Sequence, residues 1–147
     1  MSKVWIGTSG WTYDGWRGPF YPKEVRKKDW LAWYATQFPT TEINGSFYRT
    51  PSLEAVRGWR EQTPEGFLFA WKASKFITHW KRLSEKCDNS IELMETRLKA
   101  LSPKVGAVLF HAAAIRQEPR AAGLIPEDAA ALLSLCVRIS PSELVRG

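Results

Sequence analysis

The chain has 147 residues, enough for one domain with a hydrophobic core but fewer than the roughly 250 of a complete eight-stranded β/α barrel. Its 21 Lys and Arg exceed its 15 Asp and Glu, and the residues that give the net charge of +6 are scattered over residues 1–110. This charge is compatible with an anionic ligand, but it does not by itself indicate nucleic-acid binding. Two distant cysteines, no signal-peptide core and no long apolar run argue against a disulfide framework, a zinc site, export and membrane insertion, and we expect a cytoplasmic protein.

Short apolar runs alternate with helical patterns along the first part of the chain. The runs predict strands, and a loop rich in glycine, proline and aromatic residues follows the first of them. Helical apolar spacing and the capping residues Ser52 and Asn89 or Ser90 predict a helix after this loop and after each of the next two strands. The expected strands are residues 3–8, 41–47, 67–73 and 105–110, and the expected helices are residues 30–38, 52–61 and 89–101.

This alternation predicts an α/β fold with right-handed crossovers and a parallel sheet. Ligands of such folds bind at the carboxyl ends of the strands. Glu42 and Asn44 are two residues apart on one expected strand, so their side chains share a face, and Lys72 ends the next strand. Glu42 and Lys72 form either a catalytic acid/base pair or a structural ion pair.

Further polar and aromatic residues follow the same strand ends and complete the predicted site. Arg49 is either an anion clamp or a surface residue stacked on Tyr48. His79 is a candidate general acid or base without a visible carboxylate partner. The tryptophans either stack on bases or sugars or pack in the core. The predicted substrate-binding residues are Ser9, Trp11, Asn44, Tyr48, Arg49 and Ser74.

The sequence shows no phosphate-cradling glycine motif, no nucleophile elbow and no metal-ligand spacing. We therefore predict no metal site, and the cofactor, if there is one, is unknown.

Several segments in chain order resemble the YecE-like family, domain of unknown function 72. The resemblance covers residues 4 to 110 and implies a TIM-type barrel of unestablished activity, of which this chain would hold roughly the first four β/α units. The segments that carry it include Ile6-Gly7-Thr8-Ser9-Gly10-Trp11, Glu42-Ile43-Asn44, Phe47-Tyr48-Arg49 and Phe69-Ala70-Trp71-Lys72-Ala73-Ser74.

The composition changes at residue 111, because every aromatic residue lies at or before Phe110 and the rest is rich in alanine. The resemblance implies Gln-Leu-Pro-Pro after Phe110 and a later Phe-Glu-Phe-Arg-His-Pro-Ser-Trp segment. Synonymous codons for residues 136–146 can encode that later segment in another reading frame. We therefore expect two parts: residues 1–110, half of a barrel, and residues 111–147, a non-homologous, out-of-frame tail that is disordered or helical.

Three functional hypotheses follow for the chain. The first is a truncated, inactive fragment that associates with itself through exposed sheet edges. The second is an enzyme acting on a polar or phosphorylated, anionic small molecule through Glu42, Lys72 and Arg49. The third is a nucleic-acid-binding module that uses the basic surface and the tryptophans. Binding that weakens steeply with salt would distinguish the third from the second.

Overall fold

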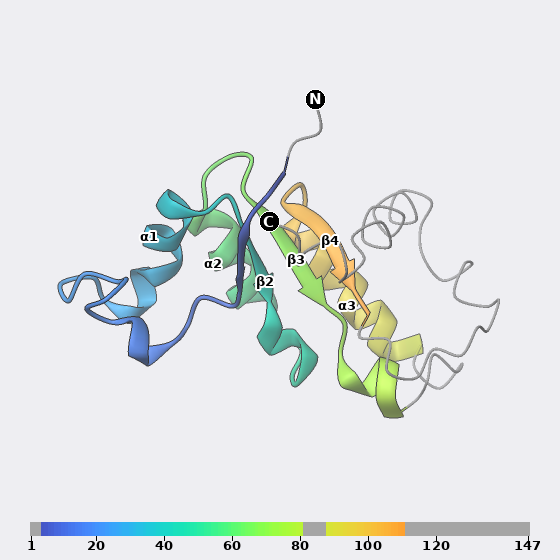
Figure 1. Ribbon diagram of the computed structural model, residues 1–147. Coiled ribbons are helices and arrows are strands. Elements are labelled where there is room, and N and C mark those ends of the chain that lie inside the picture. The colour runs from blue at the N-terminus through green and yellow to red at the C-terminus, as the bar shows by residue number, and fades with distance from the viewer. Residues whose placement is uncertain (1–3, 81–87, 111–147) are drawn as a thin grey trace.

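The computed structural model describes residues 4–80 and 88–110, without the side chains of residues 79 and 80. Four strands and three α-helices alternate along this part of the chain (Figure 1). The strands are β1 (Gly7–Ser9), β2 (Thr40–Ile43), β3 (Leu68–Lys72) and β4 (Val105–Leu109). The helices are α1 (Trp30–Gln37), α2 (Leu53–Gln62) and α3 (Asp88–Leu101).

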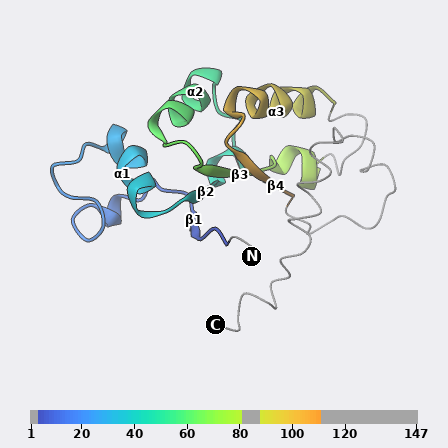
Figure 2. The same ribbon diagram turned by 90° about the horizontal axis from the view of Figure 1, so that it is seen from above.

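The strands form one parallel sheet in the order β1-β2-β3-β4, with β1 and β4 at its two edges. All three α-helices lie on one face of this sheet, as Figure 2 shows from above. The prediction of an α/β fold with a parallel sheet is therefore confirmed. The predictions for residues 111–147 lie outside the described residues.

The helix boundaries follow from local chemistry. The side chain of Ser52 accepts a hydrogen bond from the amide of Ala55 at 3.1 Å, which is the predicted cap at the start of α2. Gly66, with φ +82°, turns the chain between α2 and β3 in a conformation that favours glycine. The helix predicted to begin at Asn89 or Ser90 begins at Asp88 and ends at Leu101, as expected.

All four strands are shorter than the sequence predicts, and the difference is largest for β1 and β2. Of the expected strand at residues 3–8, only Gly7 and Thr8 pair with β2, and the strand continues to Ser9. Strand β2 ends at Ile43, because the next four residues, Asn44–Phe47, form a 3-10 turn. The Asn-Gly-Ser sequence favours a turn over continued strand, and the hydroxyl of Ser46 lies 2.6 Å from the carbonyl oxygen of Ile43.

The two faces of the sheet differ in burial. Thr41, Ile43, Phe69 and Trp71 are buried against the helices. Their alternating neighbours point to the opposite face and are half-buried. We call this second face the inner face; its central residues are Thr40, Glu42, Leu68, Ala70, Lys72 and Ala107.

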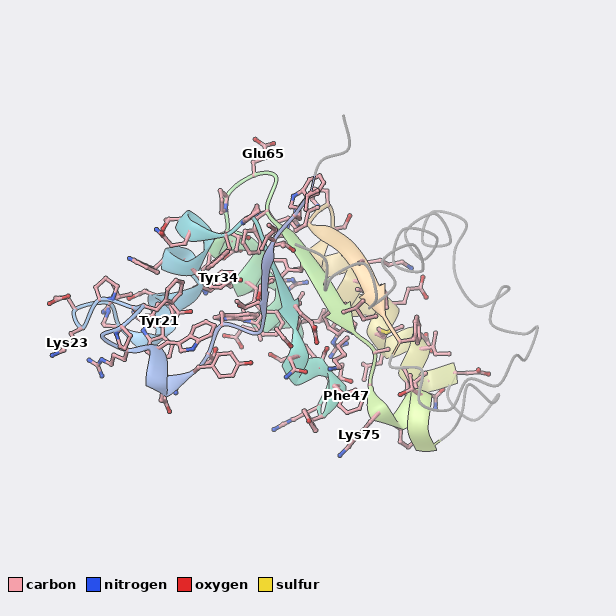
Figure 3. The ribbon with its side chains drawn as sticks, in the orientation of Figure 1. Tyr21, Lys23, Tyr34, Phe47, Glu65 and Lys75 are labelled. Carbon is pink, nitrogen blue, oxygen red and sulfur yellow. The ribbon has the colours of Figure 1, made fainter. Side chains whose placement is uncertain are left out.

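The long loop after β1 packs against α1 through aromatic side chains. Tyr21 stacks on Trp30 with ring centroids 4.4 Å apart and an interplanar angle of 6°, and Phe20 meets Trp33 edge-on at 4.8 Å. In Figure 3, Tyr21 lies in this loop and Tyr34 lies between the loop and the sheet. The tryptophans in this cluster thus act as packing residues.

Tyr34 joins the first two strands from the helix side. Its buried hydroxyl accepts a hydrogen bond from the amide of Thr8 at 2.9 Å and donates one to the carbonyl oxygen of Thr40 at 3.0 Å. The two strands also lie so close together that a Cβ atom added to Gly7 would be 1.9 Å from the carbonyl oxygen of Thr40. Position 7 therefore accepts no side chain without movement of the backbone.

Candidate strand-end site

Three of the predicted polar residues meet at the carboxyl ends of β2 and β3. The ammonium nitrogen Nζ of Lys72 lies 3.4 Å from Oε1 of Glu42 and donates a hydrogen bond to Oδ1 of Asn44 at 3.2 Å. Glu42 lies within β2 and Asn44 opens the turn that follows it. The predicted pairing of Glu42 with Lys72 is therefore present, with Asn44 as a second partner of the ammonium.

The carboxylate of Glu42 is only partly satisfied. Its Oε1 is buried and lies within ion-pair distance of Lys72, but no donor among the described residues makes a hydrogen bond to it. The side chains of Glu42 and Lys72 are 20% and 22% exposed, so solvent reaches this pair only partly. A buried carboxylate oxygen without a donor is costly, and a donor from outside the described residues would stabilise it.

The turn after β2 also positions the lysine. The hydroxyl of Ser46, a buried residue, lies 2.5 Å from the carbonyl oxygen of Lys72, and Nζ of Lys72 sits 5.2 Å above the ring centroid of Phe47. Sequence reasoning did not single out Ser46 and Phe47 for the site. The available signal was the Asn-Gly-Ser turn sequence, which shortens β2 and brings residues 46 and 47 back over the end of β3.

Basic and aromatic residues surround this cluster. The ring of Tyr48 is exposed, and Nζ of Lys75 lies 5.3 Å from its centroid, in the position that the sequence suggested for Arg49. Arg49 is exposed at the end of the turn. Figure 3 shows Phe47 and Lys75 at one end of the sheet and Glu65 at the other. Lys75 and Arg49 thus add two positive charges beside the Glu42 to Lys72 ion pair.

The other predicted site residues have different surroundings. Ser9 pairs in register with Glu42 and so shares the inner face. Trp11 packs edge-on against Trp59 of α2 at 5.4 Å, on the helix side, and is not brought to the cluster. Trp11 is therefore a packing residue rather than part of the site.

Ser74 and His79 belong to the helical turn after β3. The hydroxyl of Ser74 accepts a hydrogen bond from the amide of Phe76 at 3.2 Å and so caps this turn. His79 lies in the π-helical segment Phe76–Trp80, but its side chain is outside the described part of the structure.

Two groups with displaced pKa values lie away from the cluster. Burial, and secondarily Tyr34, raises the pKa of Tyr21, whose hydroxyl donates to the carbonyl oxygen of Trp11 at 2.6 Å. Burial, and secondarily Arg60, lowers the pKa of Lys104, while Glu65 opposes this shift. Lys104 donates to the carbonyl oxygens of Arg60 and Thr63 at the end of α2, so both groups serve the fold.

Two surface hollows, of about 410 and 770 Å³, lie at the amino ends of the strands. The first is lined by residues that precede β2 and β3, and the second lies between the ends of α2 and α3. In β/α folds that end serves stability, and ligands bind at the carboxyl ends. The Glu42, Asn44 and Lys72 cluster therefore remains the candidate site.

Within residues 4–80 and 88–110, no three His, Cys, Asp or Glu side chains come together in a way that could hold a metal ion. The helices in the same part of the chain are too short or too polar to cross a bilayer. The cluster itself offers one carboxylate, one ammonium and one amide. These groups can transfer a proton and bind polar or anionic groups.

In a comparison with known protein families, residues 5–122 match the family described as "Protein of unknown function DUF72". This match continues beyond residue 110, where we expected the family resemblance to end. The UPF0759 protein YecE of Escherichia coli K12 is 34% identical over 104 residues, which are 70% of this chain and 35% of that protein. The UPF0759 protein YunF of Bacillus subtilis 168 is 30% identical over 112 residues, which are 73% of this chain and 39% of that protein.

Two solved structures share the fold. A DUF72 family protein of Thermotoga maritima is 25% identical with a TM-score of 0.57, over 73% of this chain and 43% of that one. A DUF72 family protein of Enterococcus faecalis is 22% identical, also with a TM-score of 0.57, over 88% of this chain and 44% of that one. The chain thus spans less than half the length of each of these four relatives.

Proposed function

The chain belongs to the DUF72 family of proteins of unknown function, and from that premise we propose that residues 4–110 are the first four β/α units of a TIM-type barrel. In this proposal Glu42, Asn44 and Lys72 are half of a binding site for a polar or phosphorylated small molecule. The supporting observation is the buried Oε1 of Glu42, which lacks a hydrogen-bond donor among the described residues beside a partly exposed lysine. Such an oxygen fits a site in which a ligand hydroxyl supplies the missing donor.

Each residue has a stated role in the complete site. Glu42 accepts a proton from the ligand hydroxyl and Lys72 stabilises the negative charge that develops. Asn44 holds the ammonium of Lys72 in place through its Oδ1. Arg49 and Lys75 at the rim attract a phosphate or carboxylate group. His79 and Ser74 follow β3 and are further candidates for contact with the ligand.

The chain by itself is catalytically inactive in this proposal. Active sites of β/α barrels draw residues from strands around the whole ring, and four strands supply only half of them. The proposal includes an out-of-frame origin for residues 111–147, which sequencing the coding DNA from codon 105 onward tests directly. A continuous frame through the expected Phe-Glu-Phe-Arg-His-Pro-Ser-Trp segment would refute that origin and indicate a complete barrel.

The binding site is tested with inorganic phosphate as the probe. We expect weak, millimolar binding, with amide chemical shifts that change near Asn44 and Lys72, and no turnover of phosphorylated substrates. The variant Lys72→Met should abolish these shifts, whereas Lys99→Met, which removes an exposed ion pair on α3, should leave them intact. Equal binding by both variants, or shifts only elsewhere in the chain, would refute the site.

The role of Glu42 is tested separately. Glu42→Gln keeps the shape of the side chain and removes its negative charge, so phosphate should bind at least as tightly as before. In a complete family barrel the corresponding substitution should abolish turnover. Turnover that survives would exclude Glu42 as the base and leave only the structural ion pair.

A further inference from the structure

The two edges of the sheet are unprotected among the described residues. Strand β1 has β2 on one side only, and β4 has β3 on one side only. The residues just before β1 favour strand structure, yet Val4 and Ile6 are 76% and 69% exposed and do not pair with β2. An apolar strand edge of this kind promotes association with another strand.

The inner face has the composition of a barrel interior. Among the described residues no helix lies on this face, which carries Leu68, Ala70 and Ala107 beside the ion pair of Glu42 and Lys72 (Figure 2). A sheet that faced water permanently would alternate apolar and charged residues more fully. Apolar residues on both faces are typical of a parallel sheet that is covered on both sides.

We propose that two copies of this chain close one eight-stranded barrel about a two-fold axis that runs along the strands. In this dimer β4 of each copy lies beside β1 of the other, so all strands stay parallel and all helices stay outside. Eight strands are the number at which side chains just fill a barrel interior. The two contacts are identical by symmetry, so the association ends at two copies and leaves no edge.

The charges of the inner face permit this arrangement. Each copy carries its own Glu42 to Lys72 pair, 3.4 Å apart, so bringing two inner faces together adds no net charge from these residues to the interior. The solved relatives are more than twice as long as the part of them that this chain matches, and they have further chain available to complete the ring. In the proposed dimer the second copy supplies the strands that complete the ring.

The inference depends on the half barrel proposed above, but not on its ligand. The test is the mass of the full chain by light scattering and sedimentation across a range of concentrations. We expect a monomer to dimer equilibrium with no larger species. The double variant Val4→Lys and Ile6→Lys places charges at the β1 edge and should shift the dissociation constant upward at least tenfold. The matched control is Leu93→Lys, at an apolar position on α3 that is 40% exposed. This variant should leave the dissociation constant of the dimer unchanged.

Hydrogen exchange of the unaltered protein gives a second measurement that does not depend on a variant. Amides of residues 4–9 and 105–109 should gain protection as the protein concentration rises. A monomer at all concentrations, an open-ended series of aggregates, or protection independent of concentration would overturn the dimer. If β1 to β4 keep their order in such a monomer, the half-barrel proposal stands and only the second copy is refuted.

Discussion

Replacing Tyr34 by Phe removes one hydroxyl that joins β1 to β2. That hydroxyl accepts from the amide of Thr8 at 2.9 Å and donates to the carbonyl oxygen of Thr40 at 3.0 Å, and the side chain is fully buried. Because the ring is unchanged, the apolar packing of α1 stays intact. Two main-chain groups lose a partner where water has little access, so the free energy of unfolding should fall by about 1–3 kcal/mol.

Urea denaturation followed by tryptophan fluorescence measures this change, since the chain has eight tryptophans. In a thermal scan, a loss of 1 kcal/mol corresponds to a fall in Tm of about 4–8 °C for a folded domain of about 100 residues. The control is Tyr48→Phe, because Tyr48 is 66% exposed. A Tyr34→Phe midpoint equal to that of Tyr48→Phe would refute the role of the hydroxyl in holding β1.

Three further changes test the fold. Gly7→Ala places a Cβ 1.9 Å from a carbonyl oxygen of β2 and should destabilise the protein by about 1–3 kcal/mol in urea, whereas Gly45→Ala meets no atom within 4 Å and should have little effect. Ser52→Ala removes the cap of α2 and should lower the free energy of unfolding by about 1 kcal/mol, and no change in the urea midpoint would show that the cap is dispensable. Because burial raises the pKa of Tyr21 in the folded state, the unfolded state releases that proton first and stability should fall as pH rises above about 10; Tyr21→Phe should flatten this decline, and an unchanged slope would count against it.

The sequence by itself determined the order and type of the elements. Apolar runs flanked by turn residues gave the four strands, and Ser52 marked the start of α2 because a capping hydroxyl acts within one helical turn. The parallel sheet followed from the alternation of strands and helices. The pairing of Glu42 with Lys72 was also predictable, because adjacent parallel strands bring their carboxyl ends to the same edge.

Only the tertiary structure decided which of the other candidates join that pair. Trp11 and Ser9 are near neighbours in sequence, yet one packs on the helix side against Trp59 and the other shares the inner face with Glu42. The Asn-Gly-Ser sequence favours the 3-10 turn locally, but the contacts of Ser46 and Phe47 with Lys72 join this turn to β3, which is distant in sequence. Local patterns encode backbone conformation over a few residues, whereas the environment of a side chain depends on which segments the whole chain packs together.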